Sequence, residues 1–157
     1  MNEITSADDR QVGGNHYKNG GYDHWNLALV VPYSYLEVCS TKYLARWRKK
    51  GSPITDLQKS LHYLQKLIED GKPLSRNLTP PELRTEVARF GTANGLGDME
   101  RRFCLILGWW VKREELSEAQ EILLKLLDDA EALAEKPHPV PLSDSNKHAE
   151  RADKTGW

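Results

Sequence analysis

Two amphipathic helical patterns joined by Gly51 occupy residues 36–67, and this hairpin constrains the fold more than any other feature. Ser34 and Glu37 have the spacing of a capping box, in which the serine hydroxyl accepts a first-turn N–H and the carboxylate accepts the N–H of the cap residue. This spacing predicts a helix that begins there and runs to about Lys50. At helical spacing, its predicted buried stripe is Leu36, Cys39, Tyr43 and Trp47.

A second helix is predicted from Pro53 to Asp70, because Ser52-Pro53 provides a cap and a first-turn proline and Gly71 ends the pattern. Apolar residues recur along this helix in the a/d register that packs on another helix. They are Ile54, Leu57, Leu61, Leu64 and Ile68. The short connection at Gly51 predicts that the two helices are antiparallel neighbours.

Helical periodicity continues through the rest of the chain. Further helices are predicted over residues 24–31, 80–90, 99–110 and 114–135. The predicted fold class is therefore all-α, with helical hairpins packed as a small bundle and no sheet. The predicted organisation is a flexible N-terminus (1–14), a helical domain (15–71), a second helical hairpin module (72–136) and a disordered tail (137–157).

The charge balance and the cysteines narrow the class of protein. The 22 basic and 23 acidic residues give a net charge of −1, whereas general nucleic-acid binders carry a basic excess. Cys39 and Cys104 lie in apolar helical patterns, which predicts buried free thiols in a reducing compartment. No apolar run approaches the roughly 20 residues that cross a membrane, and the N-terminus lacks a signal-peptide pattern. We expect a soluble cytoplasmic protein.

A cationic stripe follows the first helix of the hairpin. It consists of Lys42, Arg46, Lys49 and Lys50. Cations one turn apart repel each other, so the stripe is most useful if it binds an anion. Alternatively, the last two lysines only complement the helix dipole. Cations beside Tyr43 and Trp47 suit a nucleotide, whose phosphates need charge and whose base stacks on a ring. A stripe on the second helix would border the same groove and consists of Asp56, Lys59, Tyr63 and Lys66.

Other motifs give weaker indications. His16 and His24 have no partner at ligand spacing, so no metal site is predicted. The glycines of residues 91–97 lack the Lys-Ser/Thr of a phosphate loop and are interpreted as a helix–helix connection. Acidic residues of the last helix are typical of a solvated helix face, although all-α nucleotide pyrophosphohydrolases bind metal through similar residues. They are Glu114, Glu115, Glu118, Glu121, Asp128, Asp129 and Glu131.

Several ordered motifs resemble a small phage and prophage family. They are Asn15-His16-Tyr17, His24-Trp25, KYLARWRKK at residues 42–50, Asp56-Leu57, Lys59 and His62-Tyr63. The family, formerly of unknown function, is described as nucleotide kinase-like and includes the deoxynucleoside monophosphate kinase of short-tailed coliphages. The chain departs from the family pattern at Asn26, Cys39 and Ser60, where aspartate, asparagine and alanine are usual. The resemblance covers residues 14–70.

The resemblance implies a phosphotransferase that moves a phosphoryl group from ATP or another nucleoside triphosphate to a (deoxy)nucleoside monophosphate. His16 and Asp56 would be catalytic. Phosphates would bind to Lys42, Arg46, Lys49, Lys50 and Lys59. The base would stack on Tyr17, Trp25, Tyr43 or Tyr63. The resemblance implies no resident cofactor or metal. It leaves open whether magnesium accompanies the triphosphate. A second copy of the chain would be needed to complete the site, so a homo-oligomer is expected. The alternatives are a nucleotide-sequestering protein without turnover, for example a sponge for cyclic defence signals, and an all-α pyrophosphohydrolase.

Overall fold

The computed structural model describes residues 21–136, and the predictions for residues 1–20 and 137–157 lie outside that range. His16 and Tyr17 are therefore not placed. The described part consists of helices and their connections and contains no strand, which confirms the all-α prediction. The helices are α1 (His24–Val30), α2 (Tyr35–Arg46), α3 (Pro53–Asp70), α4 (Pro80–Asn94), α5 (Asp98–Trp109), the short 3₁₀ helix η1 (Arg113–Glu115) and α6 (Leu116–Ala134).

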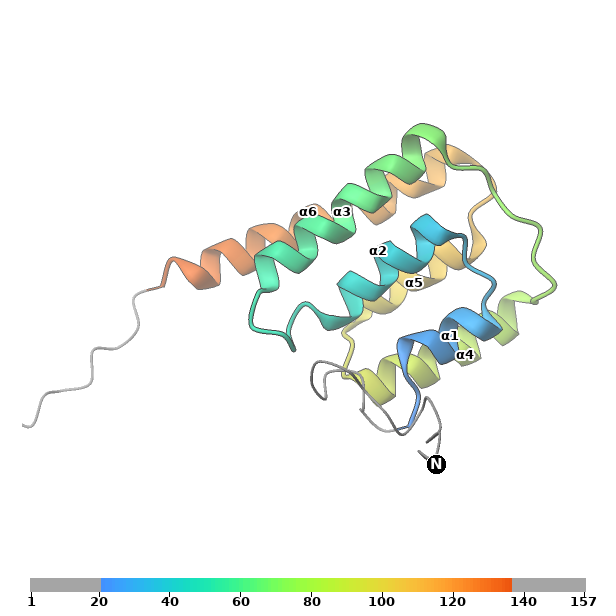
Figure 1. Ribbon diagram of the computed structural model, residues 1–157, viewed down its shortest axis with the longest axis horizontal. Coiled ribbons are helices and arrows are strands. Elements are labelled where there is room, and N and C mark those ends of the chain that lie inside the picture. Colours follow the sequence, from blue (N-terminus) through green and yellow to red (C-terminus); the bar gives the residue numbers. More distant parts are fainter. Residues whose placement is uncertain (1–20, 137–157) are drawn as a thin grey trace, which may run out of the picture.

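Four helices form the centre of the bundle (Figure 1). Helix α2 packs on α3, α3 on α6, α6 on α5, and α5 on α2. Helix α4 extends this arrangement by packing on α5, and α1 fills the corner between α4 and α2. The apolar positions predicted for α3 are buried or partly buried against the core, as are Leu83, Val87 and Phe90 of α4. One apolar core therefore runs through both halves of the described chain.

The start of α2 follows the predicted local chemistry, whereas the Ser52 side chain makes no cap hydrogen bond at the start of α3. In the capping box of α2, the Ser34 N–H donates to Glu37 Oε2 at 2.7 Å and the Glu37 N–H donates to Ser34 Oγ at 3.4 Å. Thr79 and Glu82 form the same box at the start of α4. The predicted end of α2 at Lys50 is wrong, because the helix ends at Arg46. Residues 47–50 instead form a turn that leads into Gly51, whose φ of +77° suits glycine.

The buried stripe predicted for α2 is largely wrong. Only Trp47 of that set is buried, and the helix instead turns a polar face inward. Its buried residues are Glu37, Ser40, Thr41, Leu44, Ala45 and Arg46. Ser40 Oγ donates to the Ser60 carbonyl at 2.9 Å, and Ser60 Oγ donates to the Ser40 carbonyl at 2.8 Å. These two small residues bring α2 and α3 into close contact while satisfying their own hydroxyl groups.

Glu37 is a fully buried carboxylate that joins three parts of the chain. Besides its cap contact to Ser34, it accepts hydrogen bonds from Arg76 Nη2 at 2.6 Å and Trp110 Nε1 at 2.6 Å. The Arg76 side chain is itself only 5% exposed, and it comes from the connection between α3 and α4. Because a buried charge is tolerated only when it is paired, this carboxylate fixes the connection and the end of α5 to the start of α2.

A second buried carboxylate, Glu100 of α5, lies at the other end of α2. It accepts a hydrogen bond from Trp47 Nε1 at 3.1 Å and forms an ion pair with Arg48. Trp47 and Arg48 both belong to the turn that follows α2. Trp47 keeps helical dihedral angles (φ −56°, ψ −30°), and the Lys49 N–H donates to the Arg46 carbonyl at 2.8 Å, so the chain leaves α2 through a tight turn that the contacts with Glu100 hold against α5.

His24 is buried at the junction of α1 and α2. Its Nε2 lies 2.8 Å from Thr41 Oγ1, and the hydroxyl proton of Thr41 is donated to the Glu37 carbonyl at 2.8 Å. The histidine therefore donates through Nε2 to Thr41. Burial, together with the nearby charge of Lys42, lowers the pKa of His24 from 6.5 to about 4. The imidazole is neutral in the folded protein at neutral pH.

This burial predicts a pH-dependent loss of stability. The folded pKa of His24 lies below the unfolded one, so the unfolded chain binds the extra proton as the pH falls from 6.5 to 4. Between pH 8 and pH 5, wild type is expected to lose about 2 kcal/mol more unfolding free energy than His24→Gln. Urea unfolding of both proteins at the two pH values measures the difference. Equal losses in the two proteins would show that the pKa of His24 is the same in the folded and the unfolded chain.

The two cysteines differ in accessibility. Both are free thiols; Cys104 is buried as predicted, but Cys39 is partly exposed, so the prediction for Cys39 is wrong. Burial raises the pKa of the Cys104 thiol to about 12. None of the helices in residues 21–136 has the length and apolar character needed to cross a membrane.

Candidate functional site

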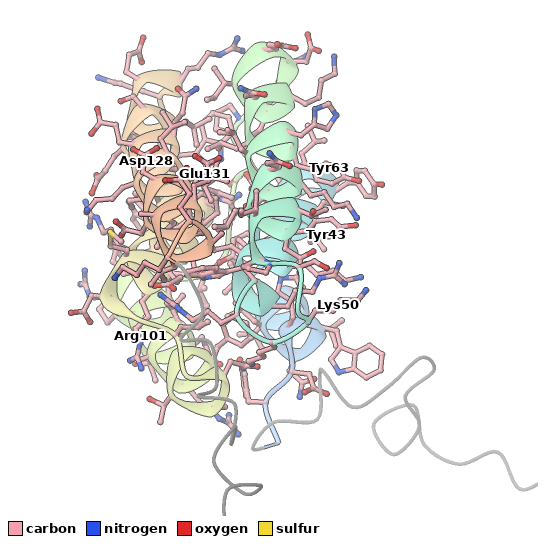
Figure 2. All side chains as sticks on the ribbon, turned by 90° about the vertical axis from the view of Figure 1, so that its left-hand side faces the viewer. Tyr43, Lys50, Tyr63, Arg101, Asp128 and Glu131 are labelled. Carbon is pink, nitrogen blue, oxygen red and sulfur yellow. The ribbon has the colours of Figure 1, made fainter. Side chains whose placement is uncertain are left out.

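The surface shared by α2 and α3 carries three tyrosines, Tyr35, Tyr43 and Tyr63. We call this surface the tyrosine face. The rings of Tyr43 and Tyr63 are stacked with centroids 5.8 Å apart and an interplanar angle of 8°. Tyr35 approaches Tyr63 edge-on at 6.4 Å. Figure 2 shows Tyr43 and Tyr63 projecting outward on the side of the bundle away from the α6 residues Asp128 and Glu131.

Cations lie directly against the stacked rings. The Arg46 guanidinium is 4.5 Å from the centroid of Tyr43, and Lys59 Nζ is 5.3 Å from the same centroid. Lys50 is exposed and projects on the same side of the bundle as the tyrosines (Figure 2). Lys42, on α2, is partly exposed. The hairpin thus brings residues from both predicted stripes onto one surface.

Arg46 and Asp56 form a buried, bidentate ion pair beneath this surface. Arg46 Nε donates to Asp56 Oδ2 at 3.2 Å, and Arg46 Nη2 donates to Asp56 Oδ1 at 3.0 Å. Asp56 is 2% exposed and Arg46 is 9% exposed. This geometry fixes the guanidinium against the Tyr43 ring. To reach a substrate as a base, the Asp56 carboxylate would first have to leave Arg46.

The structure places two of the proposed site residues elsewhere. Lys49 turns toward α4, where its Nζ donates to Asn94 Oδ1 at 3.0 Å, and burial lowers its pKa. Asn94 in turn donates to the Tyr22 and Phe90 carbonyls. Trp25 lies on α1, half exposed, and makes no ring contact within residues 21–136. The hairpin pattern does not place Trp25 relative to the tyrosines, because α1 lies outside the hairpin.

Tyr35 belongs to the tyrosine face but to neither of the stripes predicted from the sequence. Tyr35, Cys39 and Tyr43 are spaced four residues apart, which places them on one stripe of α2. The same spacing was interpreted as a buried stripe, although an aromatic stripe on the surface would fit it equally well. A hydrogen bond with Cys39 and the proximity of Tyr63 raise the pKa of the Tyr35 hydroxyl.

The acidic residues of the last helix make contacts of other kinds. Glu118 accepts both hydrogen bonds of a bidentate pair with Arg102, at 2.7 and 3.0 Å. Glu115 accepts the backbone N–H groups of Val111 and Lys112 at 2.6 and 2.9 Å. Across the described range 21–136, no three His, Cys, Asp or Glu side chains are grouped closely enough to hold a metal ion.

Comparisons with protein-family models, with curated proteins and with solved structures gave no match. The chain is therefore characterised by its own fold and surface: an all-α bundle with a cation-flanked tyrosine stack on the α2–α3 hairpin.

Proposed function

We propose that the tyrosine face binds a nucleotide. The observation that carries the proposal is the parallel stack of Tyr43 and Tyr63, with Arg46 and Lys59 against one of its rings. A base is a flat, weakly polar ring and stacks on aromatic side chains, whereas its phosphates need cations at the edge of such a surface. The hairpin offers both within one stretch of surface.

The phosphates would lie toward the cations that flank the rings. Lys59 is exposed on α3, and Lys42 and Lys50 add positive charge from α2 and its following turn. Arg46 is held by Asp56 in one orientation. A guanidinium that is already oriented loses less side-chain freedom when an anion binds. In this proposal Asp56 supports binding by positioning Arg46.

The geometry favours nucleotide binding without turnover. Phosphoryl transfer requires two substrates in line, with charge neutralisation at the transferred group. The tyrosine face offers cations and rings, while Asp56 is already engaged with Arg46. A cytoplasmic nucleotide-sequestering protein needs no more than this. Kinase-like transfer is the second candidate, and its support is the resemblance of the residue 42–50 and Asp56 motifs to the nucleotide kinase-like family.

A homo-oligomer would suit either form. The tyrosine face lies on the outside of the bundle (Figure 2), and a second copy of the chain placed over it would enclose a nucleotide between two hairpins. Sedimentation of the full chain with and without nucleotide tests this extension separately from binding itself.

Two substitutions test nucleotide binding. Tyr63→Ala is expected to weaken affinity by at least about fivefold, since stacking contributes about 1–3 kcal/mol per base. Lys59→Ala is expected to weaken it by up to about fivefold, the upper range for an exposed ion pair. Titration calorimetry of the full chain with monophosphates, triphosphates and cyclic nucleotides, with and without magnesium, measures both. Lys125→Ala, an exposed lysine on α6, is the matched control.

Chromatography of the same mixtures separates the candidate functions. Unchanged nucleotide recovered with the protein supports sequestration, whereas a new diphosphate formed as ATP is consumed establishes a kinase. Absence of binding to the whole panel, or equal affinity in wild type and Tyr63→Ala, would contradict the proposed site.

A further inference from the structure

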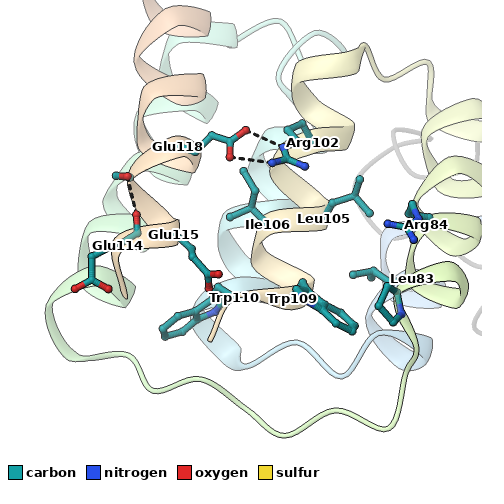
Figure 3. Close-up of a pocket in the computed structure, with 12 residues that line it drawn as sticks. Leu83, Arg84, Arg102, Leu105, Ile106, Trp109, Trp110, Glu114, Glu115 and Glu118 are labelled. Carbon is teal, nitrogen blue, oxygen red and sulfur yellow. Dashed lines mark hydrogen bonds and ion pairs between the residues drawn. The ribbon is translucent and has the colours of Figure 1, made fainter. Parts of the chain in front are cut away.

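A second concave site lies away from the tyrosine face. It is a groove of about 450 Å³ between α4, α5 and the start of α6 (Figure 3). None of its lining residues belongs to α2 or α3. The volume lies within the range of about 300–1,000 Å³ that is typical of small-molecule sites.

The wall between α4 and α5 is apolar and aromatic. Leu83 of α4 and Leu105 and Trp109 of α5 line it, and Figure 3 shows the Trp109 ring lying close to Leu83. Trp109 is 44% exposed, although tryptophan is usually more deeply buried. A large flat apolar surface is therefore available to a ligand in the groove.

Arg84 adds a cation to this apolar wall. Figure 3 shows its guanidinium directed toward Leu105 across the groove. The neighbouring Arg102 is already in a bidentate pair with Glu118. Arg84, by contrast, has no ion pair or hydrogen bond with any residue in the part of the chain that the structure describes. Its five N–H donors are therefore available to an anion.

The acidic lining residues lie on the opposite side of α5 from Arg84. Glu115 is used by the backbone of Val111 and Lys112, and Glu118 is used by Arg102. Figure 3 shows Glu114 turned away from the labelled residues of the groove. The α4 side of the groove is therefore the positive side, and a ligand placed there meets Arg84 and Trp109 together.

We infer that this groove binds a small planar aromatic anion, with its ring against Trp109 and Leu105 and its negative group on the Arg84 guanidinium. A planar guanidinium matches a carboxylate in a two-bonded arrangement. The ring adds apolar contact with tryptophan, the residue with the largest aromatic surface. The inference is independent of nucleotide binding at the tyrosine face, because the two sites share no residue.

The experiment uses 1-naphthoate as the probe and 1-naphthalenemethanol as its neutral counterpart. Both are titrated into the full-length ¹⁵N-labelled protein, and binding is followed at the Trp109 indole N–H, which is assigned by its absence in Trp109→Phe. Naphthoate is expected to shift this signal and to bind at least about tenfold more tightly than the alcohol, as for a hydrogen bond to a charged group. Arg84→Met is expected to remove this tenfold preference.

Two further variants keep the test specific. Arg89→Met changes another exposed arginine of α4 that lies over the Tyr22 ring outside the groove, and it should leave naphthoate affinity unchanged. Arg84→Lys retains the charge and should keep part of the preference. The inference is overturned if the Trp109 signal does not move, if the acid and the alcohol bind equally, or if Arg84→Met retains wild-type affinity.

Discussion

Glu37→Ala is expected to lower the free energy of unfolding by about 3–5 kcal/mol, the loss that follows when one partner of a buried ion pair is removed. The substitution leaves the Arg76 guanidinium and the Trp110 indole N–H without their acceptor in the interior. Domains of this size have a total stability of about 5–15 kcal/mol, so a large part of the stability should disappear. Urea unfolding monitored by circular dichroism measures the change.

Glu82→Ala is the matched control for Glu37→Ala. Glu82 occupies the same capping-box position in α4, but its contacts to Thr79 are exposed to solvent. Its loss should cost only about 0.3–1 kcal/mol, as for an acidic residue in an exposed first turn. If Glu37→Ala fails to fold, Glu37→Gln keeps one acceptor oxygen for Trp110, while its NH2 group replaces the oxygen that accepts from Ser34 and Arg76. Equal losses for Glu37→Ala and Glu82→Ala would show that the buried contacts add nothing.

Asp56→Ala is expected to have a comparable effect, again about 3–5 kcal/mol, because it deprives the buried Arg46 of both hydrogen bonds to a carboxylate. The double substitution Arg46→Met/Asp56→Leu should recover much of this loss, since apolar residues of similar volume often replace a buried pair without cost. Thermal and urea unfolding of the single and double variants measure the coupling between the two side chains.

Asp129→Ala provides the control for Asp56→Ala. Asp129 pairs with Lys125 on the exposed side of α6, and removing it should cost no more than about 0.5 kcal/mol. A double variant less stable than Asp56→Ala would contradict the account of the pair. The result also bears on function, because loss of activity in Asp56→Ala would reflect unfolding unless binding is measured on folded protein.

Local signals in the sequence were enough to predict where helices begin. The capping boxes at Ser34 and Thr79 involve residues three positions apart, so their geometry is contained in the sequence itself. The inward face of α2 was not predictable in this way. Glu37 is buried by Arg76 and Trp110, which lie 39 and 73 residues away along the chain.

In the candidate site, too, some features follow from local sequence patterns and others depend on residues far away in the chain. Helical spacing and the short turn at Gly51 were enough to bring Tyr43, Lys59 and Tyr63 to one surface. The departure of Lys49 from this group depends on Asn94, a residue of α4 whose position no local pattern reveals. His16 and Tyr17 lie outside the described residues, so their proposed roles stay predictions.

The serine contact between α2 and α3 sets the dimensions of the tyrosine face from within. Side chains on a helix lean toward its N-terminus, so Tyr43 leans back over Ser40, and Tyr63 leans back over Ser60. Both the serine contact and the stacked rings join α2 to α3. Substitutions that change the side-chain volume at positions 40 and 60 are therefore expected to change the spacing of α2 and α3. They would change the width of the aromatic surface without altering any group that a ligand would touch.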